Sequence, residues 1–206
     1  MTGPEDGSPC VFVVDDDAAV RRAIALLLRS VGHRVEVFDS GRSFLDAFDP
    51  PRPGCLVLDL RMPGMSGLEV QQALLERGLR VPIVFVTAHG DVPNAVEAMQ
   101  AGAVDFLQKP FREQDLLDRV HKALEIEAAG REETQDLAEL NERLERLTPR
   151  EREVMLRVVD GHANKVIAYD LEVSERTVEI HRSRVMAKME AQSLAELVRM
   201  AVRLNN

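Results

Sequence analysis

The sequence has 206 residues, a length that suits one large domain or two small ones. Its 45% hydrophobic and 30% charged residues are typical of a folded protein and exclude an intrinsically disordered chain. The net charge of −9 is uneven: residues 1–127 carry −7, residues 128–147 carry −3 and residues 148–206 carry +1, so nucleic-acid binding would need a local basic face in the last segment.

Short apolar runs alternate with segments of helical periodicity over residues 10–125. The runs predict strands at residues 10–14, 34–38, 55–58, 81–86 and 104–107. The periodic segments predict helices at residues 18–31, 40–48, 68–76 and 91–101, and a long helix from residue 114 onward. Near-continuous apolar strands are typical of a sheet that is covered on both faces. We therefore expect an α/β fold with a doubly wound, five-stranded parallel sheet of the flavodoxin-like type.

The next segment is helical and charged, and we expect a linker helix over residues 126–146. Leu137, Leu140, Leu144 and Leu147 are spaced 3, 4 and 3 residues apart and form a narrow apolar seam. This seam is out of phase with the earlier apolar positions of the helix, and Gly130 lies between the two. The pattern leaves open a hinge at Gly130 or a long helix with a register change, and a solvated or a dimerising helix.

Residues 147–206 predict a small all-α domain, with helices at 149–160, 164–171, 175–189 and 194–204. Thr148 with Glu151, and Ser193 with Glu196, have the spacing of capping boxes, and Ser174 is a third cap. The tight connection between the second and third helices predicts a helix-turn-helix module.

Other features narrow the class of protein. Cys10 and Cys55 fall in predicted strands, so we expect buried, reduced thiols, which suit a cytoplasmic location; a redox-sensing pair is the alternative. Residues 1–9 lack the pattern of a signal peptide and are interpreted as a leader. No apolar run approaches the roughly 18 residues of a membrane helix, so no membrane partner is expected. The five histidines show no zinc-ligand spacing.

Reactive side chains follow several predicted strands: Asp15 and Asp16, Asp59, Thr87, and Lys109. Because the carboxyl ends of parallel strands meet at one edge of a sheet, we expect these groups to lie close together. Three carboxylates repel one another, and a hard divalent cation such as Mg²⁺, or Mn²⁺ in its place, relieves that repulsion. One aspartate can then act as a nucleophile towards phosphorus, while the lysine and threonine stabilise phosphoryl oxygens.

Four motifs resemble the receiver domains of two-component response regulators. They are VVDDD at residues 13–17, LDLRMPGMSG at 58–67, VTA at 86–88 and FLQKPF at 106–111. The resemblance covers about residues 10–125 and implies that Asp59 takes a phosphoryl group from a phosphohistidine of a sensor kinase. It also implies that Asp16 and Asp59 bind Mg²⁺ directly with the backbone carbonyl of Arg61, and that Asp15 acts through water.

The same resemblance implies a cis peptide between Lys109 and Pro110 and a switch residue at Phe106, which lacks the hydroxyl of a tyrosine. Phosphorylation adds roughly −1.5 to −2 charges, so we expect Thr87 to move towards the phosphoryl group and Phe106 to fill the vacated space. That movement would reshape the face made by helix 91–101, strand 104–107 and helix 113–125. Receivers of this kind commonly dimerise through this face, and its apolar members here would be Val92, Val96 and Met99; ordinary core packing is the alternative for these three.

The last segment resembles the LuxR-type helix-turn-helix over about residues 145–205, through LTPRE at 147–151, NKVIA at 164–168, VSERTVEIHR at 173–182 and MAKM at 186–189. With a receiver, this resembles the NarL/FixJ class and its FixJ-like branch. In such a module helix 175–189 enters the major groove, and Val178, Val185 and Met189 pack inward. The candidates for base contact are Glu179, Ile180 and Ser183. The candidates for phosphate contact are Lys165, Thr177, Arg182, Arg184 and Lys188.

The sequence therefore predicts a phosphorylation-activated transcription regulator with a leader (1–9), a receiver domain (10–125), a linker helix (126–146) and a DNA-binding domain (147–206). The expected partners are a sensor histidine kinase, double-stranded promoter DNA and, on phosphorylation, a second copy of the chain, with RNA polymerase as a further candidate. Beyond its own phosphoryl uptake and slow autodephosphorylation, no enzyme activity is expected.

Two rival functions follow from the same motifs. A magnesium-dependent phosphatase would need a carboxylate two residues after Asp59, where the chain has Arg61. A constitutive DNA-binding protein with a vestigial receiver would bind DNA whether or not Asp59 is present.

Overall fold

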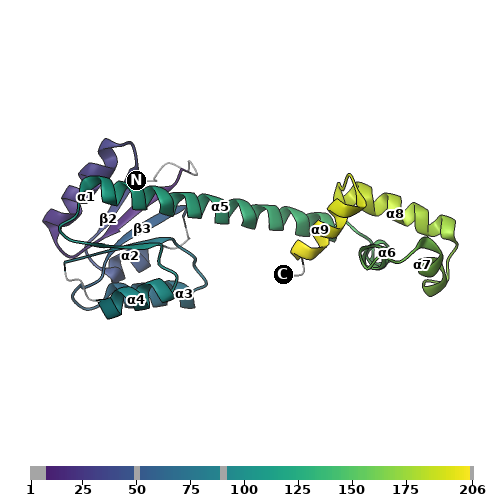
Figure 1. The fold of residues 1–206 in the computed structure, drawn as a ribbon, viewed down its shortest axis with the longest axis horizontal. Helices are drawn as coiled ribbons and strands as arrows, with labels where there is room; N and C mark the ends of the chain where they lie inside the picture. The colour runs from purple at the N-terminus through teal and green to yellow at the C-terminus, as the bar shows by residue number, and fades with distance from the viewer. Residues whose placement is uncertain (1–7, 49–51, 89–91, 205–206) are drawn as a thin grey trace. The chain divides into compact units, whose positions relative to one another are not determined.

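The computed structural model describes residues 8–48, 52–88 and 92–204, without the side chain of Val92. It divides the chain into two compact units, Met1–Gly130 and Arg131–Asn206 (Figure 1). Most of the expected leader, and the expected start of a helix at residue 91, lie outside the described residues. No described helix is long and apolar enough to cross a membrane.

The first unit is built on a parallel sheet that has five strands in the described residues, in the order β2-β1-β3-β4-β5. This order confirms the expected doubly wound arrangement. The strands are β1 (Cys10–Val14), β2 (Arg34–Phe38), β3 (Gly54–Asp59), β4 (Ile83–Thr87) and β5 (Asp105–Gln108). Strand β4 begins two residues later than predicted, because Pro82 has no amide hydrogen to give to the sheet.

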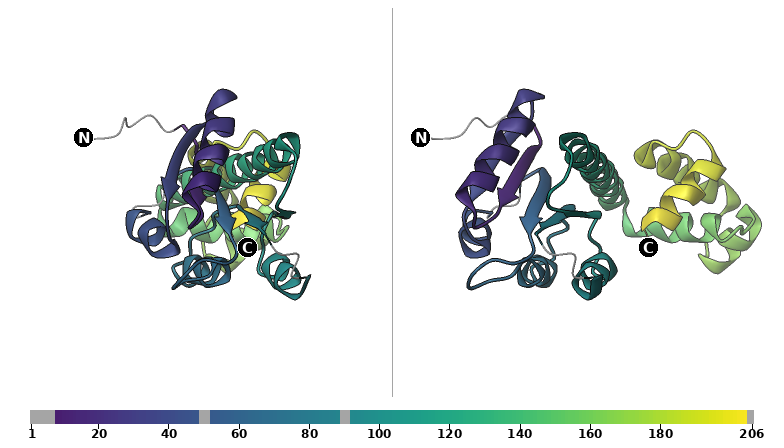
Figure 2. Two further views of the ribbon diagram at one scale, coloured as in Figure 1. Left: turned by 90° about the vertical axis from the view of Figure 1, so that its left-hand side faces the viewer. Right: turned by 60° about the vertical axis from the view of Figure 1, so that its left-hand side comes forward.

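Helices cover both faces of this sheet (Figures 1 and 2). They are α1 (Ala18–Ser30), α2 (Gly41–Ala47), α3 (Gly67–Glu76), α4 (Val92–Gln100) and the first part of α5 (Glu113–Glu145). Asp17 caps α1 by accepting hydrogen bonds from the amides of Ala19 and Val20. Ser66 and Glu69 form a complete capping box at the start of α3.

Alternation along the strands gives the sheet two apolar cores. On β1, Phe12 packs with residues of α2 and α3, whereas Val11 and Val13 pack with residues of α1 and α5. Each such side chain contributes about 1.5–3 kcal/mol when it is fully buried. The cysteines, Cys10 and Cys55, are buried and unbridged, which confirms the expectation of reduced thiols.

The second unit contains the end of α5 and the helices α6 (Pro149–Val159), α7 (Asn164–Asp170), α8 (Glu175–Met189) and α9 (Leu194–Leu204). Val178, Val185 and Met189 of α8 are buried in its core, as predicted. The capping box of Thr148 and Glu151 is confirmed.

The second predicted capping box forms only in part. Ser193 Oγ accepts a hydrogen bond from the Glu196 amide at 3.2 Å, but Glu196 Oε2 accepts from the amide of Gln192 at 2.8 Å and not from that of Ser193. The Glu196 carboxylate therefore caps the amide of Gln192, one residue before the amide that the predicted capping box would use.

Helix α5 runs without a break through Gly130, so the long-helix alternative holds. Its early apolar positions Leu117, Val120 and Leu124 pack against the core that lies under α1. Its late position Leu144 packs against the core of the second unit, and Leu140 is buried. The apolar pattern of the helix therefore changes phase because one helix contributes side chains to two different cores.

Candidate functional site

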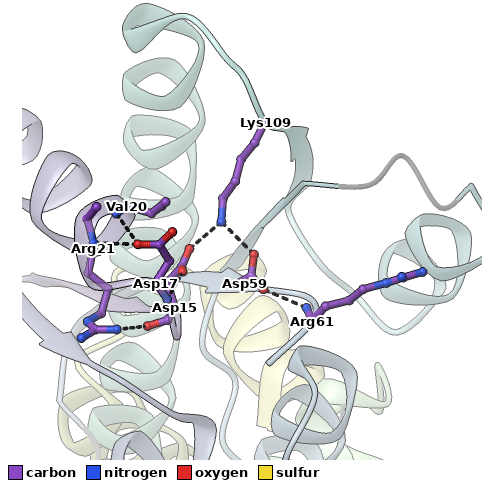
Figure 3. Close-up of polar contacts among 8 residues, drawn as sticks. Asp15, Asp17, Val20, Arg21, Asp59, Arg61 and Lys109 are labelled. Atoms are coloured by element: carbon purple, nitrogen blue, oxygen red, sulfur yellow. Dashed lines mark hydrogen bonds and ion pairs between the residues drawn. The ribbon is translucent and has the colours of Figure 1, made fainter. Parts of the chain in front are cut away.

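Three of the reactive side chains predicted at the strand ends, those of Asp15, Asp59 and Lys109, come together in the first unit (Figure 3). Strands β1, β3 and β4 are neighbours, so Asp15, Asp59 and Thr87 lie at the same edge of the sheet. These three side chains belong to residues that are only 2%, 6% and 1% exposed, respectively. Buried carboxylates need compensating partners, and the site supplies them.

The main partner is Lys109, which follows β5. Its Nζ donates hydrogen bonds to Asp15 Oδ2 at 2.6 Å and to Asp59 Oδ1 at 2.9 Å (Figure 3). The backbone amide of Lys109 donates to the carbonyl of Thr87 at 2.7 Å, which fixes the lysine beside β4. The peptide between Lys109 and Pro110 is cis, as the resemblance implied.

The other oxygen of Asp59 is held by the turn that follows β3. The amide of Arg61 donates to Asp59 Oδ2 at 2.9 Å, and the Arg61 side chain extends away from the carboxylate (Figure 3). The turn closes where the Gly67 amide donates to the carbonyl of Leu60 at 2.9 Å. A Cβ atom at Gly67 would lie 2.5 Å from the backbone oxygen of Asp59, so the close approach requires glycine.

Burial and charge act in opposite directions on these groups. Burial raises the pKa of Asp59, the nearby Asp15 raises it further, and the bonds from Lys109 and Arg61 offset only part of that rise. Burial alone would lower the pKa of Lys109, but its two carboxylate partners outweigh that effect and the pKa is raised. Lys109 therefore carries a positive charge at neutral pH, and the neighbouring Asp59 takes up a proton more readily than an ordinary aspartate does.

The structure brings together two of the three carboxylates expected to hold a metal ion, so the full ligand set stays a prediction. Within the described residues, no three Asp, Glu, His or Cys side chains are arranged so that they could hold a metal ion. Asp16 is exposed, whereas Asp15 turns inward and accepts from the amide of Asp17 at 2.9 Å. Asp15 and Asp59 still offer only oxygen donors, and one or two carboxylates with waters and phosphate oxygens are what Mg²⁺ takes. The residues present therefore fit Mg²⁺, with Asp15 and Asp59 buried and Asp16 at the exposed rim.

One contributor was missed in the sequence. Arg21, on α1, donates from its guanidinium to the carbonyl of Asp15 at 2.6 Å (Figure 3). It fixes the backbone at the end of β1, and nothing in the sequence separates it from an ordinary helix arginine.

The predicted switch residues lie beside this site and on its neighbouring elements. Thr87 is buried at the end of β4, and Phe106 of β5 is half-buried against the core under α2 and α3. On α4, Val96 and Met99 are 49% and 45% exposed, so the core alternative is wrong for both. The side chain of Val92 lies outside the described residues. Helix α4 thus presents apolar side chains to solvent.

In the second unit, α8 presents the predicted face to solvent. Glu179, Ile180, Ser183 and Arg184 are exposed, while the opposite face of the helix is buried. Lys165 is exposed on α7. These side chains are free of the core, and their roles as base and phosphate contacts stay predictions.

Three other predicted contacts already have partners in the protein. Thr177 Oγ1 lies 2.8 Å from Ser174 Oγ, and Arg182 donates to Asn164 Oδ1 at 2.7 Å. Lys188 donates to Glu151 Oε2 at 2.6 Å and to the carbonyl of Arg146 at 3.0 Å. The ammonium of Lys188 is already paired with a buried carboxylate, so its assignment as a phosphate contact stays a prediction that competes with this pairing.

Comparison with known proteins gives two family matches. Residues 11–121 match the response regulator receiver domain, and residues 145–201 match the bacterial regulatory proteins of the luxR family. The response regulator protein TmoT of Ectopseudomonas mendocina is 44% identical over 201 residues, which cover 98% of this chain and 91% of TmoT. The transcriptional regulatory protein FixJ of Rhizobium meliloti is 48% identical over 193 residues, which cover 93% of this chain and 94% of FixJ.

Solved structures agree. The response regulator StyR superposes with a TM-score of 0.85 at 47% identity, covering 95% of this chain and 98% of StyR. Full-length FixJ from B. japonicum gives a TM-score of 0.60 at 42% identity, covering 96% of this chain and 98% of that protein.

Proposed function

Because the chain belongs to the response regulators that join a receiver domain to a LuxR-type DNA-binding domain, we propose that Asp59 is its phosphoryl acceptor and that phosphorylation activates DNA binding. The proposed organisation is a receiver over residues 10–125, a linker helix over 126–146 and a DNA-binding domain over 147–206. Proteins of this family regulate transcription and are not classical enzymes. A slow loss of the phosphoryl group by self-catalysed hydrolysis is part of the proposal.

The observation that carries the assignment is the position of Lys109 between two buried carboxylates, 2.6 Å from Asp15 and 2.9 Å from Asp59. In the proposed reaction an Asp59 oxygen attacks the phosphorus of a phosphohistidine on a sensor kinase. The new P–O bond forms as the P–N bond breaks, and the imidazole leaves. Lys109 then neutralises a phosphoryl oxygen, since its ammonium already lies at the acceptor carboxylate.

Mg²⁺, or Mn²⁺ in its place, would be held directly by Asp16 and Asp59 with the carbonyl of Arg61, and Asp15 would act through water. When bound, the ion supplies neutralisation of the charge that accumulates on the phosphoryl oxygens. The phosphatase alternative is disfavoured because the side chain of Arg61 replaces the acid it needs and extends away from Asp59 (Figure 3).

We propose that the signal leaves the site through Thr87 and Phe106. The buried Thr87 hydroxyl would turn towards the phosphoryl oxygens, and Phe106 would move into the space that it vacates. The exposed apolar side chains Val96 and Met99 of α4 support dimerisation on that face after the change.

For DNA, the exposed face of α8 supports Glu179, Ile180 and Ser183 as base contacts. Lys165 and Arg184 are the proposed phosphate contacts, joined by Thr177 and Arg182 if their internal bonds yield to DNA. Two modules on one duplex gain affinity through effective concentration, so dimerisation alone can switch binding on. RNA polymerase is a further proposed partner, and binding to promoter DNA would place the protein in the cytoplasm.

The proposal is tested by treating the protein and its Asp59→Asn variant with Mg²⁺ and beryllofluoride, a phosphoryl analogue. Sedimentation should show a doubled mass only for the unmodified protein. Selection from random DNA duplexes should then enrich a paired site. DNA binding that is the same in both proteins, with or without the analogue, would favour the vestigial receiver instead.

A further inference from the structure

The last turns of α5 are built into the second unit. Leu140 is buried, Leu144 packs against the core of this unit, and Leu147, just after α5, is part of that core. An ion pair joins Asp136 to Arg203 of α9 at 3.0 Å. Three of the four leucines in the seam that the sequence left open as a dimerisation surface, Leu140, Leu144 and Leu147, are therefore buried or packed within the protein itself.

The C-terminal end of α8 is fixed to the place where α5 gives way to α6. Lys188 donates to Glu151 Oε2 of α6 at 2.6 Å and to the carbonyl of Arg146 at 3.0 Å. Glu190, the left-handed residue that ends α8, pairs with Arg143 at 3.3 Å and Arg146 at 3.7 Å. Two charged contacts of opposite sign thus hold one end of the helix that reads DNA.

Glu151 is the buried centre of this arrangement. It is 2% exposed, and its Oε2 accepts from the Thr148 amide at 2.9 Å as well as from Lys188. A buried carboxylate cannot itself touch a phosphate or a base. Any effect of Glu151 on DNA binding must therefore pass through the residues that it holds.

We propose that Lys188 and Glu151 are positioning residues that set the angle at which α8 presents Glu179, Ile180 and Ser183 to the bases. The inference rests on the proposed function, since it requires that α8 reads DNA. Ser183 lies five residues before Lys188, or about 7.5 Å along the helix axis. Release of the anchored end would tilt α8 and misalign base contacts, while phosphate contacts, which tolerate small displacements, persist.

The experiment uses the full-length protein and two duplexes, one taken from the selection described above and one scrambled duplex of equal composition. The variants are Lys188→Met, which keeps the aliphatic stem, Glu151→Gln, and the double variant. Arg184→Met is the matched control, because it removes an exposed positive charge one turn earlier on α8. Circular dichroism at the assay temperature establishes that each variant is folded.

Lys188→Met and Glu151→Gln should each lower the ratio of specific to scrambled binding by about tenfold, and the double variant should do no worse than either. For both single variants, the slope of log affinity against log salt concentration should stay equal to that of the unmodified protein. Arg184→Met should weaken both duplexes equally and lower the salt slope by about one. Lys188→Arg, which restores the charge, should recover most of the ratio.

Two results would overturn the inference. If Lys188→Met behaves like Arg184→Met, the lysine is a phosphate contact. If the variants are folded and less stable but discriminate normally, the contact supports the fold alone. An unmodified protein that does not discriminate the duplexes would refute the proposed function itself, whereas a failure confined to the variants refutes only this inference.

Discussion

Replacing Lys109 with methionine should destabilise the first unit strongly at neutral pH. The change leaves Asp15 and Asp59 buried without their shared cation, whose Nζ lies 2.6 and 2.9 Å from them. Each pair is worth about 6 kcal/mol at an effective dielectric constant of about 20, and the cost of burying the charges offsets much of that. The net loss is limited, because one carboxyl group can take up a proton instead. At pH 7 that costs about 4 kcal/mol for an unfolded pKa of about 3.9, so we expect a loss of about 3–4 kcal/mol.

The loss should shrink in acid. Burial already raises the pKa of Asp59, and removing Lys109 removes the largest effect that opposes the rise. A carboxyl group whose folded pKa is raised contributes stability that is present at low pH and lost as pH rises through that pKa. The deficit of Lys109→Met should therefore fall to about 1–2 kcal/mol at pH 5.

The assay is urea unfolding in EDTA, followed by near-ultraviolet circular dichroism of phenylalanine, since all 7 phenylalanines lie in the first unit. Lys122→Met, which removes an exposed lysine of α5, is the control and should change little. A Lys109→Met protein as stable as the unmodified one at pH 7, or equally destabilised at both pH values, would refute this account of the site.

Other changes give separate tests. Gly67→Ala would bring a Cβ to 2.5 Å from the Asp59 carbonyl and should cost about 2–3 kcal/mol in the same urea assay. Lys188 and the Thr148 amide lower the pKa of Glu151 to about 2. The stability that Glu151 contributes is therefore present above its ordinary pKa of 4.5 and is lost as pH falls towards 2. The melting temperature of Glu151→Gln, measured by thermal unfolding, should depend less on pH over that range than the melting temperature of the unmodified protein. Val96→Asp, at an exposed position, should leave the melting temperature unchanged but prevent the doubling of mass with beryllofluoride, and a normal dimer would exclude α4 from the interface.

Much of the fold could be predicted because burial repeats with the period of each element. The strands could be found from apolar runs, and α6 from cap residues that lie three residues apart in the chain. The reactive edge could also be predicted, because strand ends of a parallel sheet meet. Which of two adjacent aspartates turns inward depends on the exact end of β1, and that is why Asp15, and not Asp16, pairs with Lys109.

Long-range pairing could not be predicted. Lys188 looks like one more exposed charge on a DNA-reading helix, and its partner Glu151 lies 37 residues earlier. Helical periodicity likewise marks Val96 and Met99 as apolar positions of α4, but it does not say whether another element covers them. That Val96 and Met99 are exposed can be seen only in the three-dimensional structure.

The central claim is that Asp59 carries an acyl phosphate. The direct measurement is intact-mass and peptide mass spectrometry after incubation with acetyl phosphate and Mg²⁺, with Asp59→Asn alongside. The account predicts a gain of roughly 80 Da that maps to Asp59 in the unmodified protein and is absent from the variant. No gain under any metal or pH condition, or an equal gain in Asp59→Asn, would contradict it.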